Sequence, residues 1–296
     1  MPFSISSAAF RGFRLLASRP GLIAAWSGFY VLAVVGIIAL LFGIGVALAL
    51  TAAGADGPRP FSDQMSGPVI ALMAGMVAFF LVFSSVMVTA VFRAVLRPDE
   101  SRFAYVRFGM DELRQVGLTL VLWLFAALMV IAPLFLISFL TAGQGAGGAI
   151  VWLAALPVLL CGWVFLGVKL SLAPVMTFAE RGFRIGDSWE VTRGRFWPLL
   201  GAWVLVLVLS LGVTLVSFIL TMIFRGMFLA QFSTFGTDPA SALTGMGPMV
   251  VVGLIGYLGV TLVSNVVQLG VVYAPQADAY QQIVRPKTTT VSDVFL

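Results

Sequence analysis

"LIAAWSGFYVLAVVGIIALLFGIGVALAL", residues 22–50, is a long run without a single charged side chain. A helix of about 20 apolar residues crosses a hydrocarbon layer of about 30 Å, so this run is long enough to span a membrane with some tilt. A cleaved signal peptide would have a shorter basic arm before it and a shorter apolar segment. The sequence therefore predicts a first membrane span that stays in the protein.

The composition of the whole chain agrees with this environment. Of its 296 residues 60% are hydrophobic and 10% are charged, with a mean hydropathy of +1.08, whereas a soluble domain carries about 25% charged residues. Histidine is absent and Cys161 is the single cysteine, which excludes intrachain disulfides, His or Cys metal sites and imidazole catalysis. We expect no cofactor, no metal and no nucleic-acid partner.

Five further apolar runs are long enough to span a membrane. The sequence predicts an all-α, polytopic membrane protein, with one integral membrane domain over residues 1–296 and six spans arranged as three hairpins. The predicted spans cover residues 22–50, 69–92, 116–140, 150–170, 199–224 and 249–273.

The basic residues predict the orientation. Of the 17 lysines and arginines, all but Arg59 and Arg225 fall on one side of a six-span arrangement. Loops rich in basic residues stay in the cytoplasm. Both termini are therefore expected inside the cell, with residues 274–296 as a cytoplasmic tail.

Residues 4–18 form a predicted interfacial helix. Ser4, Ser7, Arg11, Arg14 and Ser18 recur at helical spacing, opposite an apolar arc that includes Phe10 and Phe13. Such a helix lies in the headgroup plane, with its arginines toward anionic phosphates. Arg11 and Arg14 are candidate lipid-binding residues, although the helix can equally be a general anchor or a site for a protein partner.

A weak threefold pattern follows the hairpins. Each pair of spans begins with an amphipathic stretch, at residues 8–26, 102–120 and 186–203, and both "VFRAVLRP" (91–98) and "AYQQIVRP" (279–286) end a span. The sequence predicts three units, each a cytoplasmic surface helix followed by two spans. The alternative is that there is no repeat, and that these segments resemble one another only because each lies at the same membrane boundary.

The charged stretch "RIGDSWEVTRGRFW", residues 184–197, lies between two spans. Asp187 and Glu190 are spaced like a capping box and predict a helix start, and Trp197 is expected at the headgroup level. A phosphate headgroup site can be built here, although the wet end of a membrane helix explains the same residues. The candidate binding residues of this region are Arg181, Arg184, Arg193, Arg195 and Trp197.

Mixed charges in the loop at residues 97–114 predict ion pairs between the two large cytoplasmic loops. The carboxylates there match no metal or catalytic motif, so we identify no catalytic residue.

Polar residues are sparse inside the predicted spans. Lys169 is expected to extend its ammonium toward the inner surface. Asn265 and Gln268 share a helix face and suit either hydrogen bonds between helices or a transport site. No carboxylate is expected within the membrane, which argues against a proton-coupled pump.

Three stretches carry a resemblance to a known family. Residues 92–115, 171–201 and 273–283 resemble bacterial six-span proteins similar to the membrane domain of glycerophosphoryl diester phosphodiesterases, and Ser188, Arg193, Gly194 and Trp197 match that family's element after the fourth span. The resemblance implies a helical membrane domain acting near phospholipids or a partner enzyme. The soluble catalytic barrel found in some relatives is expected to be missing here, so hydrolytic activity is not carried over.

We therefore expect a non-enzymatic protein of the bacterial inner membrane that binds phospholipid or a protein through its basic cytoplasmic face. The alternatives are a small transporter or lipid-translocating permease, and a membrane enzyme acting on phospholipid headgroups. The expected partners are anionic phospholipids, a protein at the cytoplasmic face, and a second copy of the chain.

Overall fold

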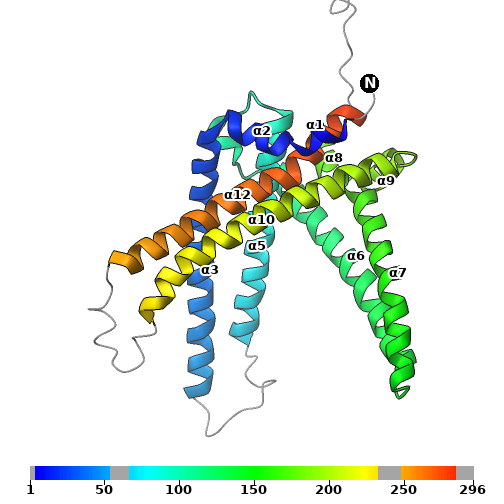
Figure 1. Ribbon diagram of the computed structural model, residues 1–296, viewed down its shortest axis with the longest axis horizontal. Helices are drawn as coiled ribbons and strands as arrows, with labels where there is room; N and C mark the ends of the chain where they lie inside the picture. The colour runs from blue at the N-terminus through cyan, green and yellow to red at the C-terminus, as the bar shows by residue number, and fades with distance from the viewer. Residues whose placement is uncertain (1–3, 54–66, 233–247, 285–296) are drawn as a thin grey trace, which may run out of the picture. The chain divides into compact units, whose positions relative to one another are not determined.

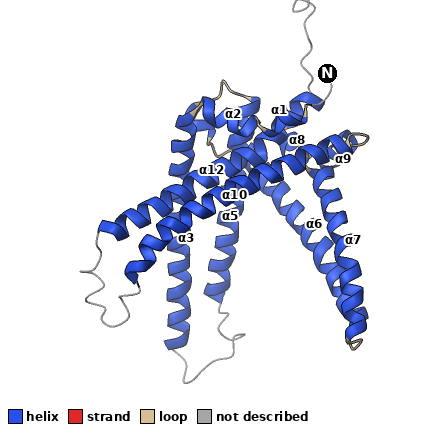
Figure 2. Ribbon diagram, viewed as in Figure 1, coloured by secondary structure: helices blue, strands red, loops and turns tan. Residues whose placement is uncertain are grey.

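Every regular element in the described part of the chain is a helix. The computed structural model describes residues 4–53, 67–232 and 248–284 (Figures 1 and 2); Arg59, Arg285 and Lys287 lie outside these ranges. Within them, six helices are long and apolar enough to cross a membrane, as predicted. They are α3 (Pro20–Ala53), α5 (Gly67–Leu96), α6 (Met110–Thr141), α7 (Ala146–Leu170), α10 (Phe196–Phe232) and α12 (Pro248–Ile283).

The long helices extend beyond the predicted spans. Hydropathy marks only the apolar part of a helix, whereas backbone hydrogen bonding continues through amphipathic turns. At residues 102–120 the prediction of a separate surface helix is wrong. A short turn, η1 (Arg102–Tyr105), is followed there directly by α6, which runs unbroken from Met110 to Thr141.

Short helices precede two of the long ones. Residues 4–18 form α1 (Ile5–Ala9) and α2 (Arg11–Ser18) instead of one helix, because Phe10 leaves helical geometry at φ −83° and ψ 2°. Between α7 and α10 lie α8 (Ala173–Glu180) and α9 (Ile185–Val191). Helix α9 begins two residues before the predicted start, so Asp187 lies in its first turn, where a carboxylate is favoured by the helix dipole.

The described residues form two compact units, and α5, α10 and α12 each contribute to both. Unit 1 comprises residues 4–8, 80–203 and 276–284. In it α6 runs beside α7 (Figure 1), while α8 packs against α6 and α9. Phe92, Phe178 and Tyr280 are fully buried there, and the Tyr280 hydroxyl lies 3.3 Å from a Glu180 carboxylate oxygen.

Unit 2 comprises residues 9–53, 67–79, 204–232 and 248–275. Phe79 of α5 packs against Gly36 of α3. Helix α2 crosses α12 at Gly12 and Gly270, so closely that a Cβ on Gly12 would overlap the Gly270 carbonyl group. The two glycines therefore let one backbone rest directly on the other.

Large apolar side chains cover the outside of the long helices. Leu124 is 73% exposed, Phe135 72% and Leu153 73%. Apolar surface left in water is unfavourable by about 25 cal/mol per Å², and patches of this extent mark contact with another apolar phase. Together with the length of six helices, this surface makes the chain a multi-pass membrane protein.

Candidate functional site

The main polar feature of unit 1 is a cavity of about 380 Å³, which we call the arginine pocket. Its walls come from the last turns of α5, the loop that follows, the first turn of α6, and the residue after α8. The lining residues are Arg93, Arg97, Glu100, Arg107, Phe108, Gly109, Met110, Asp111, Glu112, Arg114 and Arg181.

A buried ion pair forms one wall. A guanidinium nitrogen of Arg93 lies 2.5 Å from a carboxylate oxygen of Glu112, and the two side chains are 4% and 1% exposed. The Thr89 hydroxyl, also buried, lies 3.2 Å from the same oxygen. A buried pair this well hydrogen-bonded fixes both side chains, because removing either would leave an uncompensated charge. Glu112 is therefore a buried carboxylate in the first turn of α6, just outside the predicted span 116–140.

A left-handed turn lies beside this pair. Phe103, Ala104 and Tyr105 have φ values of 52°, 54° and 67°, a region that costs a non-glycine residue roughly 1–2 kcal/mol. Side-chain hydrogen bonds support the turn: Arg93 donates a 2.6 Å hydrogen bond to the Tyr105 carbonyl, and the Tyr105 hydroxyl donates a 2.9 Å bond to the Pro98 carbonyl. Arg93 thus links the strained loop to Glu112.

The carboxylates of the pocket are paired with its arginines. Asp111 lies 3.0 Å from Arg114 and 3.6 Å from Arg97, and Glu100 lies 3.1 Å from Arg107. These ion pairs stay within one loop, and so do those of Arg184 with Glu180 and Asp187. Among the described residues the predicted ion pairs between the two loops are not formed.

Contact between the two loops is instead aromatic. The guanidinium carbon of Arg97 lies 4.9 Å from the centre of the Phe178 ring, and that of Arg93 lies 5.6 Å from it. Phe178 belongs to α8 and is 1% exposed. A cation–aromatic contact holds a planar guanidinium against a rigid surface, so Arg93 and Arg97 are held in place before any ligand enters.

Arg181 completes the pocket from α8. Its φ of 56° is left-handed, its side chain is exposed, and it forms no ion pair with any residue that the structure describes. Five arginines and three carboxylates line the cavity, so it carries a formal charge of +2. Guanidinium groups bind phosphate oxygens through paired N–H donors. The described residues contain no cluster of three or more His, Cys, Asp or Glu side chains suited to a metal.

The structure does not bring together the basic residues that were predicted to form one site after the fourth span. Of Arg181, Arg184, Arg193 and Arg195, only Arg181 lines the arginine pocket. Arg184 lies 3.2 Å from Glu180 and 2.9 Å from Asp187. Arg193 and Arg195 are exposed. Trp197 is 77% exposed and lies edge-on to Phe196, which suits the headgroup level.

The prediction that Lys169 extends its ammonium to the membrane surface is wrong. Its side chain is buried at 7% exposure, and its ammonium lies 5.8 Å from the centre of the Phe165 ring and 5.3 Å from that of Trp189. Helix α9 is anchored at the same place, because the Ser188 hydroxyl donates a 2.9 Å bond to the Lys169 carbonyl. Lys169 therefore joins α7 to α9.

Asn265 and Gln268 lie on α12 in unit 2. Asn265 is exposed, and its amide donates a 2.9 Å bond to the Thr261 carbonyl one turn earlier. Gln268 is half-buried, and its carbonyl oxygen has no hydrogen-bond partner among the described residues. Arg11 and Arg14 belong to α2 in the same unit, Arg11 half-buried and Arg14 exposed.

Sequence reasoning missed the residues that form the buried part of the pocket. Arg93 and Glu112 were counted as loop charges because the predicted spans ended at residue 92 and began at residue 116. Their signal was present in helical spacing: Ser85, Thr89 and Arg93 recur every four residues on one face of α5. A polar ladder on an otherwise apolar helix indicates a buried polar neighbour.

Comparison with known proteins gives no relative for this chain: no family model, no curated protein and no solved structure matches it.

Proposed function

We propose that this protein binds the phosphate group of an anionic phospholipid in the arginine pocket, without chemical turnover. The observation that carries the proposal is a cavity with a charge of +2 in which Arg181 is unpaired among the described residues. A phosphodiester brings the opposite charge and several acceptor oxygens. The paired carboxylates act as positioning groups that hold the other arginines.

A lipid is favoured over a soluble phosphate because exposed apolar side chains line the arginine pocket beside the arginines. Phe108 and Met110 line the same pocket as the arginines, yet they are 72% and 65% exposed. Exposed apolar side chains beside a basic site suit the boundary between headgroups and acyl chains. A free phosphate ion would gain nothing from them.

The topology of the chain and its location in the cell are part of the same proposal. We propose three hairpins in a bacterial inner membrane, with both termini and the arginine pocket on the cytoplasmic side, as the distribution of basic residues predicts. The resemblance to the membrane domain of glycerophosphoryl diester phosphodiesterases supports a place among phospholipids.

The test compares two charge-matched double variants purified in mild detergent. Arg97→Gln/Arg181→Gln removes two pocket arginines, and Arg193→Gln/Arg195→Gln removes two exposed arginines outside the pocket. Bound phosphatidylglycerol is counted by native mass spectrometry, with phosphatidylcholine as the zwitterionic probe. Because a hydrogen bond to a charged group contributes about 1.5–3 kcal/mol, the pocket variant should bind phosphatidylglycerol at least about tenfold more weakly.

Equal losses in the two variants, or no loss in either, would rule the site out. Displacement by inorganic phosphate at equal concentration would show that the pocket binds phosphate without regard to the lipid. Thermal unfolding of both variants checks that the helices remain assembled.

A second candidate function, a lipid-translocating permease, has one observation in its favour. Ser85 lies one turn before Thr89 on α5, and Gln115 lies three residues after Glu112 on α6. Both side chains are buried, and a side-chain oxygen of each has no hydrogen-bond partner among the described residues. Buried unpaired polar groups line many transport paths. Proteoliposomes carrying a fluorescent phospholipid test this candidate: transbilayer movement that is lost in Glu112→Gln but kept in Asp187→Asn would support it.

A further inference from the structure

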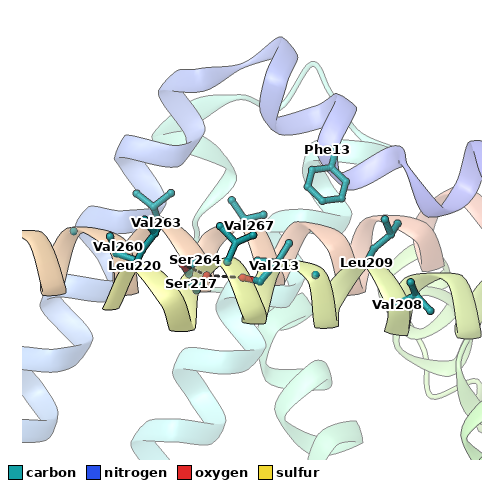
Figure 3. Close-up of a pocket in the computed structure, with 13 residues that line it drawn as sticks. Phe13, Val208, Leu209, Val213, Ser217, Leu220, Val260, Val263, Ser264 and Val267 are labelled. Carbon is teal, nitrogen blue, oxygen red and sulfur yellow. Dashed lines mark hydrogen bonds between the residues drawn. The ribbon is translucent and has the colours of Figure 1, made fainter. Parts of the chain in front are cut away.

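Unit 2 contains an apolar groove of about 650 Å³ between α10 and α12. Figure 3 shows Phe13 of α2 pointing into the groove from above the two helices. Its walls are apolar apart from Ser217 and Ser264, whose hydroxyl oxygens lie 2.5 Å apart. Ser217 also donates a 2.7 Å bond to the Val213 carbonyl, so these hydroxyls bond to each other and to the helix.

Two glycines create the space. A Cβ at Gly212 of α10 or Gly259 of α12 would meet no atom within 4 Å, although both line the groove. By contrast, a Cβ at Gly256 would overlap the Phe224 ring. Gly256 therefore brings α12 against α10, whereas Gly212 and Gly259 leave room between them.

The chemistry of the groove selects hydrocarbon. Its walls offer water almost no hydrogen-bond partner, so an apolar ligand fits the groove better than water does. Both flanking helices are long and apolar enough to cross a membrane. The volume is within the range of about 300–1,000 Å³ that is typical of small-ligand sites.

The position of helix α2 favours an acyl chain over a helix from another protein as the occupant of the groove. It rests on α12 through Gly12 and Gly270, and Phe13 closes part of the groove from that side (Figure 3). A further helix is about 10 Å wide and would have to displace it. Arg11 and Arg14 belong to the same helix α2, and positive charge on a helix at the membrane boundary complements an anionic headgroup.

We infer that the groove binds one acyl chain of an anionic phospholipid whose phosphate lies beside Arg11 and Arg14. This site uses no residue of the arginine pocket, so it goes beyond the proposed function and stands or fails without it. Phe13 separates the chain from the headgroup, and the glycines set the width of the channel.

The experiment uses the full chain in phosphatidylcholine vesicles that contain a trace of phosphatidylglycerol with a diazirine in one acyl chain. Illumination followed by peptide mass spectrometry maps the labelled residues. Labelling is expected on residues 208–220 and 259–267, and it should fall at least fivefold in Gly212→Leu/Gly259→Leu, which fills the groove. The matched control is Gly162→Leu/Gly226→Leu, at helix positions with equally open space outside the groove.

Three results would overturn the inference. The first is labelling that is unchanged in the groove-filling variant, which indicates ordinary contact with bulk lipid. The second is cross-linking of these segments to a second copy of the chain. The third is labelling that does not depend on charge, seen either as equal labelling by a phosphatidylcholine probe or as unreduced labelling in Arg11→Gln/Arg14→Gln. The pocket variant Arg97→Gln/Arg181→Gln should keep full groove labelling, which separates the two lipid sites.

Discussion

Breaking the buried Arg93–Glu112 pair should destabilise the protein far more when one partner is removed than when both are. The side chains are 4% and 1% exposed and 2.5 Å apart, and loss of one partner from such a pair costs about 3–5 kcal/mol. For Glu112→Leu we expect about 3 kcal/mol, because Arg93 still bonds to Tyr105 and lies 4.0 Å from Glu100. For Arg93→Met we expect nearer 5 kcal/mol, because Glu112 keeps only the Thr89 hydroxyl.

The double variant Arg93→Met/Glu112→Leu removes both charges. The Thr89 hydroxyl still bonds to the carbonyls of Ser85 and Val86. The Tyr105 carbonyl loses its donor, at about 1–3 kcal/mol. The double variant should therefore lose only about 1–3 kcal/mol, no more than the milder single variant, which corresponds to a coupling energy of about 5 kcal/mol or more.

Unfolding in mixed micelles of increasing dodecyl sulfate content, followed by tryptophan fluorescence, measures the four members of this cycle. The exposed pair Arg184–Asp187, with side chains 47% and 42% exposed at 2.9 Å, provides the control cycle, and its coupling should be no more than about 1 kcal/mol. Additive losses at Arg93 and Glu112 would show that the two side chains do not form a buried pair, and would refute the proposed wall of the arginine pocket.

Three further outcomes are expected. Gly12→Val should lower the unfolding free energy by about 1–3 kcal/mol through overpacking against Gly270, measured in the same titration. The control Gly28→Ala, at an open helix position, should not lower it. Equal losses in the two variants would contradict the backbone contact. Ala104→Gly should raise the unfolding free energy by up to about 1 kcal/mol, because glycine tolerates φ 54°, and a loss would show that the turn is right-handed. In a Cys161→Ser background, cysteines introduced at positions 59 and 193 should react with an impermeant maleimide from opposite sides of the membrane, and reaction of both in intact cells would overturn the orientation.

The number and class of the long helices were predictable because hydrophobicity over about 20 residues is a direct measure of membrane solubility. Helix ends were less predictable, since α6 begins at Met110 in an amphipathic turn that hydropathy cannot distinguish from a loop. For this reason the sequence suggested a surface helix over residues 102–120 where the chain forms a left-handed turn and a continuous helix.

The candidate site was predictable only in kind. Charge counting predicts a basic membrane boundary and leads to the hypothesis of a phosphate site, and Arg181, named on that ground, lines the arginine pocket. Which arginines meet depends on tertiary contacts: Arg93 and Arg97 rest on Phe178, about 80 residues away in sequence. Arg193 and Arg195 share the local charge but have no such aromatic contact within the described part of the chain, and spacing along the sequence does not reveal that difference.

One contact spans nearly the whole described chain. The backbone N–H of Ser4 donates a 3.0 Å bond to the Gln282 side chain, and Gln282 donates a 3.2 Å bond to the Ser7 hydroxyl. Ser4 and Gln282 are 278 positions apart, so during synthesis on the ribosome α1 reaches this neighbour only after α12 has been translated. Until then α1 lacks the hydrogen bonds that join it to the last described helix.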